Sequence, residues 1–308
     1  MYISKHKLLA LLLPALLLAA CTEEVDIHTK GMDRSYLVVE GMLSDRSDMP
    51  QKVLLTGSVD YFEPKTPPAV SGARVAVSDG ESRYEYTEKP AGSGCYIGPE
   101  GFCGTPGGTY TLTIDVEMDG EMRHYEAVST MEEPGFADAE IDYMYAGKPE
   151  MHIDSLWTIA LWGRDLPQTN YYFLNGKLND AVFPMQLSLA MDDKYFAGQT
   201  VTCFPVTTLA QTGLRQKMYG DCAKYLETGD VFTLYVYTIP KDYYDFYMGF
   251  VSSSVGAAIP LIQSQPSNCP TNIRGEYAAG YFVACSSTAA SVVIEEPLRP
   301  FYKKLLGL

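Results

Sequence analysis

The sequence predicts an all-β protein, with an N-terminal immunoglobulin-like β-sandwich followed by a second β-rich, sandwich-like domain that contains one helix. Three observations predict this fold class. Apolar and polar residues alternate over short runs, turn residues recur at the roughly eight- to twelve-residue spacing of β-sandwiches, and only one segment has a helical period. The expected domains cover 36–131 and 132–308, and the turn-forming stretch 132–135 separates them.

The first domain is expected to contain short strands joined by tight turns. Asp79-Gly80 and Asp119-Gly120 each follow an alternating run, and such dipeptides are typical of two-residue hairpin turns. The chain leading to Gly108 is rich in Gly and Pro, which favours an irregular connection. The expected strands cover residues 36–43, 52–55, 73–78, 83–87, 94–96, 109–116 and 122–128.

The second domain is expected to contain longer strands and the helix. Pro240 suits the start of a helix, and Tyr243 and Tyr247 follow at helical spacing, which predicts a helix over 240–251. Residues 181–225 have no clear period and predict neither a strand nor a helix. The expected strands cover residues 156–162, 170–178, 231–237, 277–285 and 291–295.

The N-terminus resembles a bacterial lipoprotein signal. Lys5 and Lys7 precede an apolar run over 8–18, which is shorter than the about 20 residues that a membrane-spanning helix needs. Small residues then lead to Cys21, as in a lipobox. Residues 1–20 are therefore expected to be a cleaved lipoprotein signal peptide, and Cys21 to carry diacylglycerol and a further acyl chain such as palmitate. The alternative is an ordinary signal peptide that happens to be followed by a cysteine.

Residues 21–35 are expected to form the lipid anchor and a polar tether. Glu23, Glu24 and Asp26 lie close to the anchor, and this acidic run resembles the export signal that moves Bacteroidota lipoproteins to the outer face of the outer membrane. The expected location is therefore the outer membrane, by a lipid anchor only, with the body facing the cell exterior. The alternative is that the acidic run is simply a solvated linker.

Acidic residues outnumber basic ones, with 38 Asp and Glu against 23 Lys and Arg and a formal net charge of −15 at pH 7. Proteins bind nucleic acid largely by neutralising phosphates with Lys and Arg. This charge balance therefore excludes nucleic acid as a partner. An acidic body is also repelled by anionic lipid, which leaves the lipid anchor as the expected contact with the membrane.

Six cysteines remain when Cys21 is assigned to lipid, and an even number in an exported protein favours disulfides. The expected pairing joins nearest neighbours, although the sequence alone allows fifteen connectivities. A zinc site is the alternative, but the chain has no Cys-x-x-Cys spacing, so no metal is expected. The expected pairs are Cys95 with Cys103, Cys203 with Cys222, and Cys269 with Cys285.

Tyrosines are the candidate contact residues, since the chain has 23 of them and several occur in clusters. Tyrosine combines a rigid apolar ring with a polar tip, which suits contact with sugars, peptides or a protein partner. Tyr244 is the first candidate because it lies off the helix face that Tyr243 and Tyr247 define, and the adjacent Tyr171 and Tyr172 are the others. The alternative is that these residues are ordinary strand and core tyrosines.

Catalytic signals are scarce. The chain has four histidines, none of them paired at metal-ligand spacing. It also lacks the Gly-x-Ser-x-Gly, phosphate-loop and His-Glu-x-x-His motifs. We expect no enzymatic activity, no catalytic residues and no cofactor. A hydrolase that uses two carboxylates remains open, because such a pair is defined in space and not in sequence.

Several stretches together carry a resemblance to a known family. They are 21–26 (Cys-Thr-Glu-Glu-Val-Asp), 37–41 (Leu-Val-Val-Glu-Gly), 70–75 (Val-Ser-Gly-Ala-Arg-Val), 107–112 (Gly-Gly-Thr-Tyr-Thr-Leu), and 266–275 with the following Gly-Tyr-Phe at 280–282. Their order and spacing resemble a Bacteroidota family of outer-membrane surface lipoproteins classed as a domain of unknown function. Met42 departs from the pattern, where an aromatic residue is expected.

This resemblance covers nearly the whole mature chain and transfers no catalytic residues. Members are commonly encoded beside TonB-dependent transporters. The resemblance therefore implies a non-catalytic accessory of a TonB-dependent nutrient transporter, which captures or presents a ligand. The first alternative is a structural or adhesive module on the cell surface, and the second is a secreted-type hydrolase.

Overall fold

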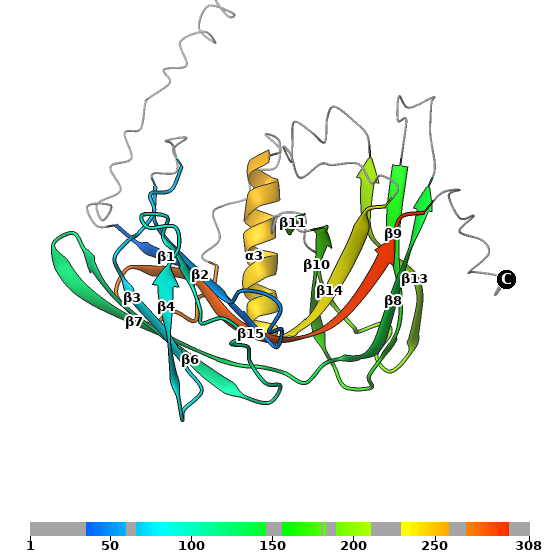
Figure 1. The fold of residues 1–308 in the computed structure, drawn as a ribbon, viewed down its shortest axis with the longest axis horizontal. Coiled ribbons are helices and arrows are strands. Elements are labelled where there is room, and N and C mark those ends of the chain that lie inside the picture. The colour runs from blue at the N-terminus through cyan, green and yellow to red at the C-terminus, as the bar shows by residue number, and fades with distance from the viewer. Residues whose placement is uncertain are drawn as a thin grey trace, which may run out of the picture. The chain divides into compact units, whose positions relative to one another are not determined.

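The computed structural model describes residues 35–59, 66–145, 156–179, 181–182, 189–210, 229–258 and 269–295. Within them nearly all regular structure is β-strand, which confirms the predicted fold class (Figure 1). The strands are β1 (Leu37–Ser44), β2 (Lys52–Gly57), β3 (Arg74–Ser78), β4 (Arg83–Glu88), β5 (Cys95–Ile97), β6 (Thr109–Met118), β7 (Glu121–Thr130), β8 (Phe136–Tyr145), β9 (Leu156–Asp165), β10 (Tyr171–Leu178), β11 (Ala181–Val182), β12 (Leu189–Asp192), β13 (Thr200–Ala210), β14 (Val231–Ile239) and β15 (Ala278–Val293), and the helix is α3 (Lys241–Ala258).

The strands form one large sheet and one small sheet. The large sheet has the order β11-β10-β14-β15-β1-β2-β5-β4-β3-β6-β7, with β12 also paired to β10. The small sheet has the order β13-β9-β8. The hairpins expected at Asp79-Gly80 and Asp119-Gly120 are present, since β3 pairs with β4 and β6 pairs with β7 in antiparallel register.

Strand β15 links the two regions of the large sheet. Its first half pairs in parallel with β1, from Leu37 opposite Ala278 to Ser44 opposite Cys285. Its second half pairs antiparallel with β14. The sequence predicted two short strands here, whereas the structure has one continuous strand of 16 residues. Residues 278–285 therefore belong to the sheet of the N-terminal region, and the domain boundary after residue 131 stays a prediction.

Side chains of the large sheet point alternately into different cores, because successive residues of a strand face opposite sides. On β15, Phe282 and Ala284 enter a core shared with β1, β2, β3, β6 and β7. Residues of β10 and β14 enter a second core with the small sheet, where Tyr172 and Phe232 are fully buried. The remaining face carries the third core, which α3 covers.

Helix α3 lies against this third core and confirms the one predicted helix (Figure 1). Tyr243, Tyr247 and Val251 follow at steps of four residues, so they share one face of the helix and pack on the sheet. Pro240 precedes the first turn, and its carbonyl accepts a hydrogen bond from the Tyr244 amide at 3.1 Å. The helix thereby presents aromatic side chains to β1, β10 and β15.

Candidate functional site

A hollow of about 200 Å³ lies between helix α3 and the large sheet. Its walls come from β1, β2, β10, β15 and α3, which are distant in sequence. The lining residues are Val39, Glu40, Gly41, Met42, Lys52, Phe173, Asn175, Tyr243, Phe246 and Tyr281. These residues form no recognisable motif in the sequence. The one feature of the sequence that could have pointed to the hollow is the charged Glu40 within an otherwise apolar strand.

One wall of the hollow is aromatic. The ring centroid of Tyr281 lies 5.2 Å from that of Tyr243 and 5.2 Å from that of Phe246. Phe173 contacts the same group, with its centroid 6.0 Å from that of Tyr243. Burial raises the pKa of the hydroxyls of Tyr243 and Tyr281, so both stay protonated and neutral at physiological pH. The wall therefore offers apolar ring faces and neutral hydroxyls.

The other wall carries two opposite charges. Alternation along β1 sends Val39 into the first core and turns Glu40 and Met42 toward α3. Lys52 starts β2 and lies opposite Met42 in the register. Burial by the surrounding protein raises the pKa of the Glu40 carboxyl, although the side chain keeps access to solvent. The hollow is thus lined by an acid, a base and aromatic rings.

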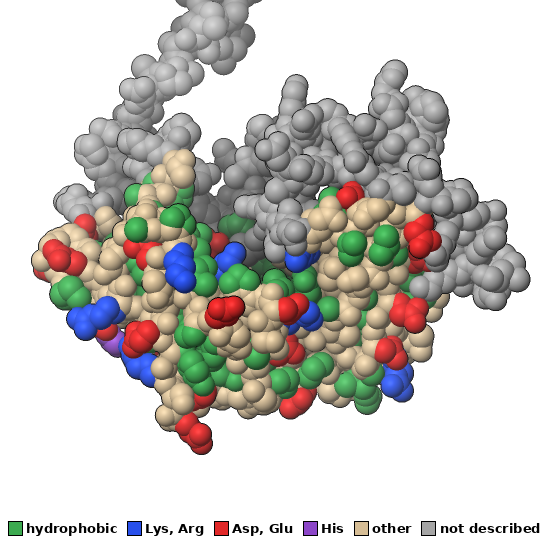
Figure 2. All heavy atoms as spheres, in the orientation of Figure 1, with side chains coloured by type: hydrophobic (Ala, Val, Ile, Leu, Met, Phe, Trp, Pro, Cys, Tyr) green, Lys and Arg blue, Asp and Glu red, His purple; other side chains and the backbone are tan. Residues whose placement is uncertain are grey.

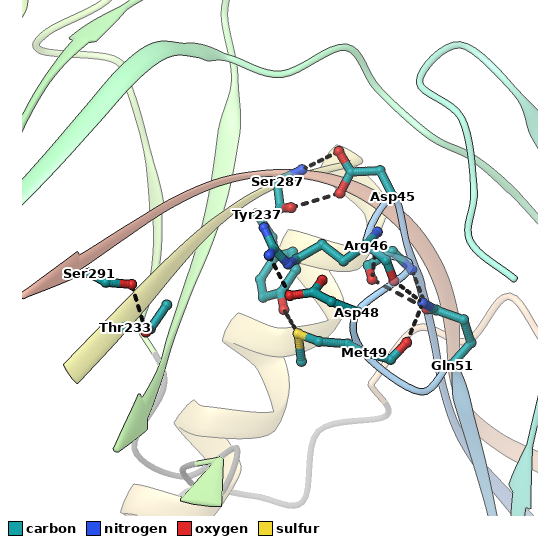
Figure 3. A network of polar contacts seen from close by, with 10 residues as sticks. Asp45, Arg46, Asp48, Met49, Gln51, Thr233, Tyr237, Ser287 and Ser291 are labelled. Atoms are coloured by element: carbon teal, nitrogen blue, oxygen red, sulfur yellow. Dashed lines mark hydrogen bonds and ion pairs between the residues drawn. The ribbon is translucent and has the colours of Figure 1, made fainter. Parts of the chain in front are cut away.

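A polar network fixes the loop between β1 and β2 on the large sheet (Figure 3). Asp45 accepts hydrogen bonds from the Ser287 hydroxyl at 2.7 Å and from the Ser287 amide at 3.1 Å. Gln51 ties the loop internally, since its side-chain nitrogen donates to the carbonyls of Arg46 and Met49. These bonds join the hairpin that carries Glu40 to strand β15, and so help to set the geometry of the hollow.

Arg46 extends this network to an aromatic side chain of strand β14, Tyr235. Its guanidinium carbon lies 5.1 Å from the ring centroid of Tyr235, and Nη2 forms an ion pair of 2.7 Å with Asp48. The Asp48 pair raises the pKa of Arg46, which keeps the guanidinium charged. Elsewhere on the visible face, acidic and basic side chains lie scattered among hydrophobic and neutral ones (Figure 2).

Two of the predicted contact tyrosines come together, and the third lies elsewhere. The rings of Tyr171 and Tyr244 are 5.0 Å apart and both are half-buried, with Lys241 Nζ 6.0 Å from the Tyr171 ring centroid. Successive side chains of β10 point to opposite faces of the sheet, so Tyr172 points away from Tyr171 and is fully buried in the second core. Its side chain is therefore not available at the surface, while a contact role for Tyr171 and Tyr244 stays a prediction.

Tyr172 belongs to a buried acidic group. Its hydroxyl donates to Asp165 Oδ1, and the Gly198 amide donates to Asp165 Oδ2 at 2.8 Å. Asp193 is also fully buried, and its Oδ2 accepts from the Asn170 amide at 2.6 Å. Burial and the charge of Asp193 raise the pKa of Asp165. The group ties β9 and β10 to the turn after β12 and lies apart from the residues that line the hollow.

The disulfide prediction is not met by the described cysteines. The expected pairs of Cys95 with Cys103 and of Cys269 with Cys285 are not formed, and Cys203 is also a free thiol. Cys285 is buried beneath α3, where its thiol donates to the Leu43 carbonyl at 3.7 Å. A disulfide needs facing side chains, and this thiol faces the core. Cys222 and the predicted lipidation site Cys21 lie outside the described residues.

Two further properties concern only the ranges that the structure describes. No group of three or more His, Cys, Asp and Glu side chains there is placed to hold a metal ion. None of the described helical structure is both long and apolar enough to cross a membrane.

The fold and the hollow define an all-β, sandwich-like protein with a small aromatic-lined cavity beneath a helix. Residues 22–291 match the family described as "Domain of unknown function (DUF4249)", and the chain belongs to this family. No curated protein matches the sequence.

Proposed function

We propose that the protein is a lipid-anchored outer-membrane protein of the Bacteroidota that faces the cell exterior and serves, without catalysis, as an accessory of a TonB-dependent nutrient transporter. In this role it captures or presents a small ligand, which the hollow beneath α3 holds. The Bacteroidota origin, the lipid anchor and the transporter rest on sequence resemblance. The hollow is the observation that carries a binding role.

The composition of the hollow supports binding. Ligand sites are concave and mostly apolar, with a few polar groups that fix orientation. The aromatic rings of Tyr243, Phe246 and Tyr281 form the apolar wall, while Glu40 and Lys52 supply the polar groups. The hollow thus combines an apolar wall with groups that can fix the orientation of a bound molecule. Its residues are therefore suited to holding a molecule.

The transporter partnership is tested by purification from the outer membrane of the native cells. The tagged full chain is extracted in mild detergent, and co-purifying proteins are identified by mass spectrometry. We expect a TonB-dependent transporter in stoichiometric amount. The matched control is Cys21→Ser, which removes the thiol that would accept the lipid, so recovery of the transporter with both forms shows that the contact does not depend on the lipid.

A tagged chain that purifies without a transporter in several detergents contradicts the accessory role. That result favours a structural or adhesive surface module, whose expected partners are host or matrix components.

A further inference from the structure

We propose that the hollow binds a free α-amino acid with an apolar side chain, whose ammonium group pairs with Glu40 and whose carboxylate pairs with Lys52. This inference rests on the proposed function, because it names the ligand class of that same site.

The first argument is the placement of the two charges. Glu40 lies opposite Leu54 and Lys52 opposite Met42, so the two charged residues are diagonal neighbours on adjacent strands. Among the described residues neither the Glu40 carboxylate nor the Lys52 ammonium group takes part in a side-chain hydrogen bond or ion pair, although the backbones of both strands are paired in the sheet. Two opposite charges therefore face one small hollow, and neither is paired with another side chain in the described part of the chain.

The second argument is the distance that such a pair spans. Diagonal neighbours on antiparallel strands stand about 7–8 Å apart. An α-amino acid between them requires two charge-assisted hydrogen bonds of about 2.8 Å, plus roughly 3 Å between its own ammonium and carboxylate groups. Flexible Glu40 and Lys52 side chains that start from positions about 7–8 Å apart can therefore reach the two charged ends of a molecule of this length. A ligand with one charge leaves one of the two residues unpaired.

The third argument is electrostatic. Burial by the surrounding protein raises the pKa of the Glu40 carboxyl. The charged and titratable described groups that line the hollow with Glu40 are Lys52 from β2, Tyr243 from α3 and Tyr281 from β15, and Asp242 of α3 lies beside Tyr281. Both tyrosines are neutral, and the Asp242 charge disfavours a second anion near the wall. A ligand ammonium group supplies the missing positive partner.

The fourth argument is size and wall chemistry. Pockets for drug-sized ligands measure about 300–1,000 Å³, so a hollow of about 200 Å³ suits a smaller molecule. Phe173, Phe246 and Met42 offer apolar surface for one aliphatic or aromatic side chain. Tyr243 and Tyr281 also line the hollow, and an ammonium group within about 6 Å of either ring centroid would gain cation–π attraction.

The test is calorimetric titration of the full chain in detergent with L-leucine, L-phenylalanine and three comparison compounds. N-acetyl-L-leucine lacks the ammonium group, L-leucinamide lacks the carboxylate, and glucose represents a neutral sugar. We expect L-leucine to bind, and each leucine derivative to bind about tenfold to a hundredfold more weakly, since a hydrogen bond to a charged group contributes a factor of this size. Glucose is expected not to bind.

Two variants assign each charge to its partner. Glu40→Gln is expected to weaken the binding of L-leucine about tenfold to a hundredfold. It is also expected to remove the preference for L-leucine over N-acetyl-L-leucine. Lys52→Met is expected to remove the preference over L-leucinamide. Affinity is also expected to fall as the pH falls through the raised pKa of Glu40, because protonation removes the anion. The matched control is Glu117→Gln, an exposed strand glutamate outside the hollow that leaves binding unchanged.

The outcomes separate this inference from the proposed function. Equal binding of L-leucine and N-acetyl-L-leucine, or no effect of Glu40→Gln, overturns the amino acid as ligand. Absence of binding by both L-leucine and L-phenylalanine overturns it as well. Glucose binding that Phe246→Ala abolishes and Glu40→Gln leaves unchanged keeps the hollow as a site and rejects only the ligand class. Failure of the transporter co-purification rejects the accessory role alone.

Discussion

Removal of the Tyr172 hydroxyl tests the buried acidic group in the second core. In the structure this hydroxyl donates to Asp165, and both side chains are almost fully buried. Tyr172→Phe keeps the ring and leaves one carboxylate oxygen without that donor. A hydrogen bond to a buried charged group contributes about 1.5–3 kcal/mol, so the free energy of unfolding at pH 7 should fall by about that amount.

The pH dependence of this loss has a defined sign. Burial raises the pKa of Asp165 in the folded state above its ordinary value. Below the ordinary value the carboxyl is protonated in both folded and unfolded chains, and as the pH rises through the raised value the folded state must hold a buried charge. The Tyr172 hydroxyl stabilises that charge. The loss caused by Tyr172→Phe should therefore be small in acid and reach its full size above the raised pKa.

The assay is urea unfolding followed by circular dichroism between pH 4 and pH 8. The matched control is Tyr86→Phe, because the buried Tyr86 hydroxyl has no hydrogen-bond partner among the described residues. That substitution should be neutral or slightly stabilising. In an Asp165→Asn background the pH dependence of the Tyr172→Phe loss should disappear. Equal effects of Tyr172→Phe and Tyr86→Phe at all pH values would refute the reasoning.

Three further predictions follow from the fold and the cysteines. Gly280→Ala should lower the free energy of unfolding, measured in urea, by about 3 kcal/mol or more. The φ of Gly280 is +90°, and an added Cβ would lie 2.0 Å from the backbone oxygen of Val39 in β1. Gly80→Ala is the control and should lower it less, because Gly80 has a similar φ of +94° but an added Cβ meets no atom within 4 Å. Burial raises the pKa of the Cys285 thiol, so an aromatic disulfide reagent should modify Cys269 in the native protein and reach Cys285 only after unfolding. Cys21→Ser should abolish the lipid mass measured on the purified protein, and a mass that keeps the lipid increment would contradict lipidation at Cys21.

The sequence by itself determined the features that depend on local patterns. The Asp-Gly turns at residues 79–80 and 119–120, the strand period around them and the helix after Pro240 are local properties, and the structure has all of them. Alternation places a residue on one face of a strand, and four-residue spacing places Tyr243 and Tyr247 on one face of a helix. These rules need no knowledge of which strands are neighbours.

Only the tertiary structure decided what lies beside what. The parallel pairing of β1 with β15 joins opposite ends of the chain, and it places Tyr281 and Glu40 in one hollow with Phe246 of α3. It also directs the Cys285 thiol into the core, where the sequence predicted a disulfide. Strand pairing between residues so far apart in the sequence depends on which apolar faces are buried together. Local periodicity predicts which residues share a face, but it does not predict which strands pair.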